Sequence, residues 1–278
     1  MTGANLFFKC ENFQKGGSFK TRGATNTLLS LSQEERNKGV VTHSSGNHAG
    51  AIARVAKNLN MKAYLVMPDN SPKTKVEYVK SQNGIIIEST AEVKSREKKC
   101  QQIMDETGAI FIPPFNDYRI ICGQASVSYE IFQKLDDIDF ILTPISGGGL
   151  FSGQCLTSSY ISPKTKMIGV EPYLARDAYL SLKEGKMHPQ LPPKTIADGL
   201  RMPLGDKTFD IIQKYAHDIL LVEEQEIIEA TNLIWKIMKI IVEPSSATVL
   251  AAVLKNKQLF QNKKIALVIS GGNVDISI

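Results

Sequence analysis

The chain has 278 residues, of which 42% are hydrophobic and 22% charged, and its formal net charge is +5 at pH 7. This length allows one large domain or two small ones with a sizeable core, and the composition is ordinary for a globular protein. Its Lys and Arg residues are dispersed, which speaks against a nucleic-acid-binding protein, where they cluster on one face.

Short, β-rich apolar runs alternate with longer helical patterns along the chain. The strand candidates are NLFFK (5–9), GVVTH (39–43), KAYLVM (62–67), GIIIE (84–88), AIFIP (109–113), DFILTPI (139–145), KMIGVE (166–171), DILLV (218–222) and KIALVIS (264–270). Helical patterns cover 47–58, 72–81, 91–107, 119–134, 148–160, 223–240 and 245–255. This alternation predicts parallel sheets covered by helices on both faces, with ligands bound at the loops after the strands.

The cysteines and the apolar runs bear on the cellular compartment. Cys10, Cys100, Cys122 and Cys155 are scattered without a CxxC pair, so neither a zinc ribbon nor a disulfide framework is expected. The N-terminal stretch does not have the pattern of a signal peptide, and no run of about 18 apolar residues occurs. We therefore expect a cytoplasmic protein with no membrane or nucleic-acid partner.

The loop QKGGSFKTRG (14–23) follows the first predicted strand and opens a helix at Lys20. A nucleotide-binding P-loop needs glycine directly before its lysine, and Phe19 stands there instead. Lys20 is then either a surface charge or a reactive amine. A lysine that is desolvated or placed near positive charge loses its proton and can form a Schiff base with an aldehyde.

Three further loops at predicted strand ends carry small and polar residues. SGGGL (146–150) opens a helix and can bind phosphate through backbone N–H groups, although a plain tight turn is the alternative. SSGNHAG (44–50) can bind a ligand or simply cap a helix. SGGN (270–273) also follows a strand. Together the loops bring an amine, a phosphate nest and polar side chains to strand carboxyl ends.

The segments GSFKTRGA, HSSGNHAGAIA, SGGGLFSG, IADGLR, EPSSA and SGGNVD occur in the order typical of one enzyme family. Over residues 5–277 the chain resembles the pyridoxal phosphate (PLP) enzymes of the serine racemase and serine/threonine dehydratase group. The resemblance implies an α/β protein of fold type II, like the β subunit of tryptophan synthase, with two lobes of mostly parallel twisted sheet covered by helices. The large PLP-binding domain would comprise 1–38 plus 118–278, and the small domain 39–117.

The resemblance also implies how the cofactor is held. Lys20 would form the Schiff base with PLP and act as the base on one face of the substrate α-carbon, with Phe19 packed beside the cofactor. Asn47 would bond the pyridoxal 3-oxygen and Ser270 the pyridine nitrogen. The phosphate would be bound by the main-chain N–H groups of Ser146, Gly147, Gly148, Gly149 and Leu150.

Further residues would bind the substrate, an amino acid. Its carboxylate would be held by Ser44, Ser45, Gly46, Asn47 and His48. Asn116 and Asp198 would line the substrate pocket. Ser45 matches the second base, on the face opposite Lys20; because many pure threonine dehydratases carry alanine there, this serine favours a racemase-competent site.

A cation site and an assembly follow from the same resemblance. Glu171, the Ala175 carbonyl and Asp177 would bind Mg²⁺ or Ca²⁺, since oxygen ligands suit these ions. Without the resemblance, the two acids indicate a solvated helix start. The family is expected to form homodimers, and ATP is a candidate effector between the subunits.

The expected function is that of a PLP-dependent serine racemase with L-serine and L-threonine dehydratase activity, forming D-serine and pyruvate. One alternative is a threonine, serine or hydroxyaspartate dehydratase without racemase activity. Another is an inactive, N-terminally truncated relative, because family members usually carry a longer segment before NLFFK. Arg201 either favours a substrate with a second carboxylate or lies in a surface loop.

Overall fold

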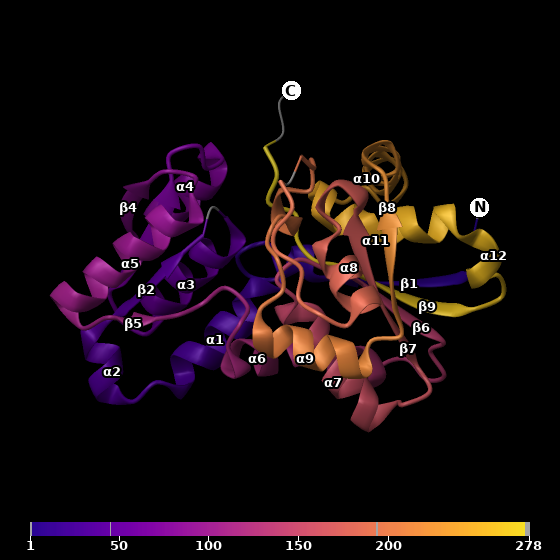
Figure 1. Cartoon of the computed structure of the whole chain (residues 1–278), viewed down its shortest axis with the longest axis horizontal. Coiled ribbons are helices and arrows are strands. Elements are labelled where there is room, and N and C mark those ends of the chain that lie inside the picture. Colours follow the sequence, from indigo (N-terminus) through magenta and orange to yellow (C-terminus); the bar gives the residue numbers. More distant parts are fainter. Residues whose placement is uncertain (1, 45, 193, 276–278) are drawn as a thin grey trace.

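A computed structural model describes residues 2–44, 46–192 and 194–275 and shows two parallel sheets, one in each lobe (Figure 1). The larger sheet contains, in spatial order, β1 (Asn5–Cys10), β9 (Lys264–Ile269), β6 (Phe140–Pro144), β7 (Lys166–Pro172) and β8 (Asp218–Val222). The smaller sheet contains β4 (Ile85–Ser89), β3 (Ala63–Pro68), β2 (Val40–His43) and β5 (Ile110–Phe111). Each strand predicted from the sequence is present, and the α/β class is confirmed.

Helices connect and cover the strands. They are α1 (Lys20–Ser30), α2 (Gln33–Lys38), α3 (Asn47–Asn58), α4 (Lys73–Ser81), α5 (Val93–Thr107), α6 (Tyr118–Phe132), α7 (Gly149–Ile161), α8 (Asp177–Glu184), α9 (Asp206–Tyr215), α10 (Glu224–Met238), α11 (Pro244–Lys255) and α12 (Lys257–Phe260). The helical patterns found in the sequence correspond to α3, α4, α5, α6, α7, α10 and α11. In the described part of the chain, no helix is both long and apolar enough to cross a membrane.

Both faces of the larger sheet are buried because its strands are apolar at consecutive positions. In β9, Leu267 contributes to a core with α10 and α11, whereas Ala266 and Val268 contribute to a core with α6, α7 and α9. Successive side chains of a strand point to opposite faces, so a continuous apolar run is what a sheet covered on both sides requires.

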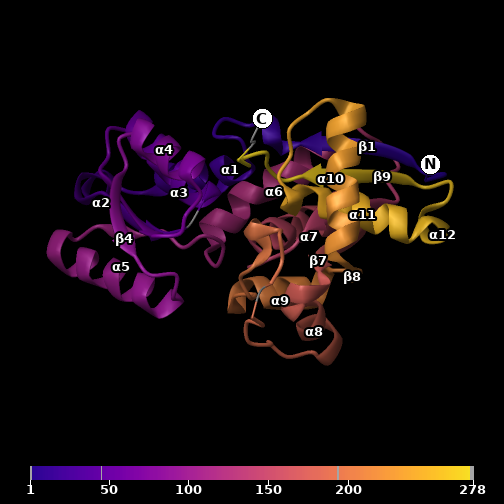
Figure 2. The same cartoon turned by 90° about the horizontal axis from the view of Figure 1, so that it is seen from above.

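Helix α1 lies with α6 between the two lobes (Figures 1 and 2). The two helices approach closely because each has a glycine at the contact: a Cβ on Gly123 would lie 2.6 Å from the Cα of Gly23. Farther along α1, Ala24 and Leu28 pack into the same core as the strands β2 and β3 of the smaller sheet. The start of α1 is thereby placed where the lobes meet.

Candidate active site

A cavity of about 560 Å³ lies between the lobes, at the loops that follow the carboxyl ends of the strands. This is the size of a typical small-molecule site and the place where parallel sheets bind ligands. Its wall contains most of the site residues predicted from the sequence. These are Phe19, Lys20, Ser44, Gly46, Asn47, His48, Ser146, Gly147, Gly148, Gly149, Leu150, Asp198 and Ser270.

Lys20 is the first residue of α1, and its amine reaches the cavity. The Nζ atom donates a hydrogen bond of 2.8 Å to the Pro114 carbonyl and lies 5.1 Å from the centre of the Phe19 ring. Burial lowers the pKa of Lys20 to about 8, although the nearby Glu243 carboxylate opposes this change. About a fifth of the amine is therefore neutral near physiological pH, and a neutral amine is the nucleophile that attacks an aldehyde.

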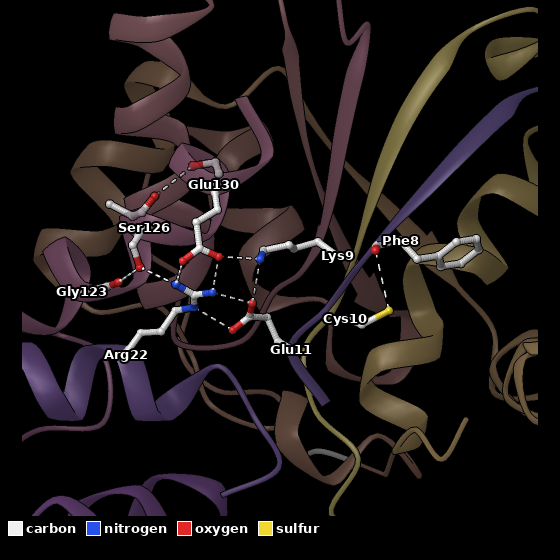
Figure 3. Close-up of polar contacts among 10 residues, drawn as sticks. Phe8, Lys9, Cys10, Glu11, Arg22, Gly123, Ser126 and Glu130 are labelled. Carbon is white, nitrogen blue, oxygen red and sulfur yellow. Dashed lines mark hydrogen bonds and ion pairs between the residues drawn. The ribbon is translucent and has the colours of Figure 1, made fainter. Parts of the chain in front are cut away.

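Two residues further along α1, Arg22 fixes the start of this helix (Figure 3). Its guanidinium donates to both carboxylate oxygens of Glu11 at 2.7 and 2.8 Å and to both of Glu130 at 2.7 Å. Glu11 follows β1 and is only 1% exposed, and Glu130 belongs to α6. Lys9 completes the cluster by contacting both acids. The end of β1, α1 and α6 are thus joined two residues from the reactive amine.

The glycine loop before α7 has the conformation of an anion cradle. Gly148 has a φ of +85°, and a Cβ on Gly147 would lie 2.3 Å from the Phe115 ring. The loop is held from behind, because the Thr208 hydroxyl donates to the Gly147 carbonyl at 2.8 Å. The first N–H groups of a helix have no partner inside the helix, so the start of α7 at Gly149 fits a phosphate group.

Asn47 is oriented from both sides of its amide. Its Nδ2 donates to the Glu243 carboxylate at 3.0 and 3.1 Å, and its Oδ1 accepts from Asn273 at 2.9 Å. Glu243 is 3% exposed, and burial raises its pKa to about 7 despite the opposing charge of Lys75. Sequence reasoning missed Glu243, although it stands in EPSSA directly before the proline that begins α11.

Lys75 was also missed, and it joins the two lobes across the cavity. It belongs to α4, is 8% exposed, and its Nζ lies 2.5 Å from the Asp198 Oδ2. Asp198 begins a short 3-10 turn (Asp198–Leu200) whose Gly199 N–H donates to the Ser245 hydroxyl at 3.0 Å. The pair therefore ties the small-sheet lobe to the start of α11. Sequence reasoning had no signal for Lys75, because it is one of many lysines.

Two other predicted residues, Ser270 and His48, are buried. The Ser270 Oγ lies 3.0 Å from the Ser246 Oγ, which also donates to the Gly271 carbonyl. His48 lies against the Ile112 carbonyl, and burial, with the charge of Lys20 as a smaller cause, lowers its pKa to about 3. His48 is thus neutral and can serve a ligand only as an uncharged ring.

Not all predicted residues gather at the cavity. Asn116 does not line it, because its amide donates to Asp206 at 2.6 Å and accepts from the Lys207 N–H at the start of α9. Ser45 lies outside the described residues. The predicted cation ligands form a separate group after β7.

In that separate group, the two carboxylates are buried and close enough to repel one another. Glu171 accepts the N–H groups of Ala178 and Tyr179 at 3.1 and 2.9 Å, and burial raises its pKa well above the usual range. Asp177 Oδ2 is buried without a hydrogen-bond partner among the described residues, and burial raises the Asp177 pKa to about 6. Across the described residues no group of three or more acidic, His or Cys side chains forms a metal site. Two carboxylates with an orphaned oxygen nevertheless suit a cation that also takes a carbonyl and waters.

A buried amine, a glycine cradle at a helix start and an oriented amide, set between two parallel sheets, define a PLP-dependent enzyme of fold type II. The family model described as "Pyridoxal-phosphate dependent enzyme" matches residues 1–271, and the chain belongs to this family.

Similar proteins include both racemases and lyases. The chain is 47% identical to serine racemase of Arabidopsis thaliana, over 99% of this chain and 85% of that protein. It is 43% identical to β-hydroxyaspartate dehydratase of Paracoccus denitrificans, over 99% of this chain and 88% of that protein. The structure of maize serine racemase superposes with a TM-score of 0.96 at 45% identity, covering 99% of this chain and 85% of that one. The chain is therefore an enzyme of the PLP racemase and lyase class.

The Arg22 cluster predicts a large effect on stability. Replacing Arg22 with Met leaves the buried Glu11 with only Lys9 at 3.5 Å, and we expect the free energy of unfolding to fall by about 3 kcal/mol. Urea denaturation measures the change. The double variant Glu11→Gln, Arg22→Met should recover part of the loss, whereas Lys38→Met, which breaks an exposed pair, should have little effect. An equal loss in the single and double variants would contradict the explanation.

The lowered pKa of Lys20 predicts the pH dependence of cofactor uptake. With a pKa of about 8, the neutral fraction rises about fivefold from pH 7 to 8 and less than about twofold from pH 8 to 9. We expect the rate of PLP attachment to the cofactor-free protein to follow this fraction, as measured by absorbance after borohydride reduction. An unperturbed lysine would instead give about tenfold at each step. The Lys20→Ala variant is the control and should show no covalent attachment.

Proposed function

We propose that the chain is a PLP-dependent serine racemase that also dehydrates L-serine and L-threonine, so that L-serine yields D-serine and pyruvate. The observation that carries the proposal is the partly neutral amine of Lys20 in one cavity with the glycine cradle and the 44–48 loop. The similarity to serine racemases over nearly the whole chain supports it.

The residues of the cavity divide the work of binding. The N–H groups of 146–150 would hold the cofactor phosphate, and the Asn47 amide, fixed by Glu243 and Asn273, would meet the pyridoxal 3-oxygen. Ser270 would face the pyridine nitrogen as a neutral partner, and backbone groups of the 44–48 loop would bind the substrate carboxylate. Bound PLP supplies the electron sink for the negative charge left on the α-carbon.

Proton transfer is assigned to two groups on opposite faces of the substrate. Lys20 would remove the α-proton from one face and could return it there. In racemisation, the Ser45 hydroxyl would supply a proton to the other face. In dehydration, loss of the β-hydroxyl after removal of the α-proton needs no second-face donor. The ratio of the two products then depends on how well Ser45 delivers a proton.

The lobe arrangement supports a closed reaction chamber. We place the small domain at 39–117 and the large domain at 1–38 plus 118–278. The ion pair between Lys75 and Asp198 joins these domains beside the cavity. Closure of the small domain would exclude water while the α-carbon carries negative charge.

A dehydratase acting on hydroxyaspartate without racemisation is the second candidate. It is favoured by the 43% identity to the dehydratase of Paracoccus denitrificans and 40% to the L-threo-3-hydroxyaspartate ammonia-lyase of Saccharomyces cerevisiae. One incubation with L-serine, scored for D-serine by chiral chromatography and for pyruvate, separates the two. Pyruvate alone would favour this second candidate.

The assembly and the effectors are proposed from the family resemblance. We expect a cytoplasmic homodimer with ATP as an effector between its subunits, which sedimentation with and without ATP would test. We also propose that Glu171, the Ala175 carbonyl and Asp177 bind Mg²⁺ or Ca²⁺; the orphaned Asp177 oxygen supports this assignment.

Ser45 is predicted to separate the two activities. The Ser45→Ala variant should lose D-serine formation by at least about 100-fold, the usual contribution of a proton donor, while it still forms pyruvate from L-serine. Both products are measured in the same incubation, with Ser30→Ala as a control in α1. An equal loss of both products would contradict the role of second base.

The cation site predicts a stability effect that does not depend on activity. At ten times its dissociation constant, Mg²⁺ or Ca²⁺ should raise the melting temperature by about 2–3 °C, since it binds only the folded chain. Asp177→Asn should abolish this rise, whereas Asp210→Asn, at an exposed position of α9, should keep it. A rise of the same size in both variants would exclude the assigned site.

A further inference from the structure

A short segment of the cavity wall, 198–202, is fixed at both ends. At one end Gly199 donates to the Ser245 hydroxyl at 3.0 Å. At the other end, two hydrogen bonds join Met202 to Ser146 of the glycine loop. The Met202 N–H donates to the Ser146 hydroxyl at 3.0 Å, and that hydroxyl donates to the Met202 carbonyl at 3.2 Å. The residue between them, Arg201, is therefore held beside the glycine loop by the backbone on either side.

Arg201 lines the cavity and has no acidic partner in the part of the chain that the structure describes. Its Nη2 donates to the Thr195 carbonyl at 2.7 Å, and its own carbonyl accepts from the side chain of Gln190 at 2.6 Å. No carboxylate among the described residues lies within salt-bridge distance of its guanidinium. By contrast, Lys75 in the same cavity is paired with Asp198. The guanidinium of Arg201 therefore retains N–H donors that could bind an anionic ligand in the cavity.

We propose that Arg201 binds the second carboxylate of a dicarboxylic β-hydroxy amino acid, so that the enzyme favours hydroxyaspartate over serine in its dehydratase reaction. The inference rests on the proposed function, because a substrate reaches this wall only with its amino group engaged near Lys20. A guanidinium presents a planar pair of N–H donors that match a carboxylate, whereas the hydroxymethyl group of serine offers no charge for it.

The reaction that this contact would serve is balanced without any further reactant. The substrate loses the α-proton and the β-hydroxyl as water, and the resulting enamine rearranges to an imine. Water then hydrolyses the imine, which releases oxaloacetate and ammonia. The second carboxylate takes no part in bond breaking, so Arg201 contributes binding and orientation and acts as a specificity residue.

Binding of non-eliminating amino acids tests the contact directly. L-Aspartate and L-alanine differ by one carboxylate and lack a β-hydroxyl, and titration of the PLP-loaded protein followed by cofactor absorbance gives both affinities. Arg201→Met should weaken L-aspartate binding by about tenfold, a modest factor because Arg201 is exposed, and leave L-alanine unchanged. The affinity of Arg201→Lys for L-aspartate should lie between those of the wild type and Arg201→Met, since lysine keeps the charge and loses the planar donor pair.

A matched control shows that the effect is local. Arg36 also donates one Nη2 bond to a backbone carbonyl, that of Leu29 at 2.6 Å, but it lies in α2 away from the cavity. Arg36→Met should leave both affinities unchanged. In turnover, Arg201→Met should lower kcat/KM for L-threo-3-hydroxyaspartate by a similar factor of about ten and leave kcat/KM for L-serine nearly constant.

The outcomes separate this inference from the proposed function. If Arg201→Met changes the two affinities equally, or changes neither, Arg201 is a surface arginine and the inference is overturned. The proposed function then stands, provided that L-alanine still alters the cofactor absorbance of the wild type. If neither amino acid alters that absorbance, the proposed function fails and the inference fails with it.

Discussion

The position of one helix start determines the chemistry of this enzyme, and a partly buried ion cluster fixes that start. Arg22 links the end of β1 to α1 and α6, and Glu11 within the cluster is almost fully excluded from water. A buried ion pair contributes little net stability compared with apolar packing, but it has a strict geometry. Its value here is that it ties α1 to β1 and α6, and the Lys20 amine stands two residues before the guanidinium.

The pKa values of the ionisable groups in the cavity depend on which of these groups are paired with an opposite charge. Lys75 is matched by Asp198, whereas Glu243 is met at hydrogen-bond distance, among the described residues, only by the neutral amide of Asn47. Burial therefore acts in opposite directions on Lys20 and Glu243, lowering the pKa of the lysine to about 8 and raising that of the acid to about 7. Both groups can exchange protons near neutral pH. A fully paired cavity would hold its lysine charged and unreactive.

The sequence predicted the strands well because their signal is local. A strand buried on both faces must be apolar at successive positions, as β6 and β9 are, and such a run is visible without any partner. The glycine loop could also be recognised in the sequence. A side chain would clash at Gly147 and Gly148, so the structure requires glycine at both positions. Glu243 and Lys75 could not be found in this way, because their roles arise from contacts across 196 and 123 positions of the chain. Asn116 shows the converse. It follows Phe115 of the cavity wall in the sequence, but its amide binds the start of α9 instead.

The scaffold itself does not choose between racemase and dehydratase, or between serine and a dicarboxylate. Relatives of both kinds match nearly the whole chain at comparable identity, so we expect the choice to rest on side chains at the cavity. Two regions of the cavity wall would meet the substrate in the proposed function: the loop with Ser44, Gly46 and His48 on the small-sheet lobe, and the 198–202 segment on the other. In our proposals, the first supplies the proton on the second face of the α-carbon, and the second meets the end of the substrate side chain. Because the two regions belong to different lobes, stereochemistry and side-chain preference can change independently while the cofactor cradle and the α1 anchor stay the same.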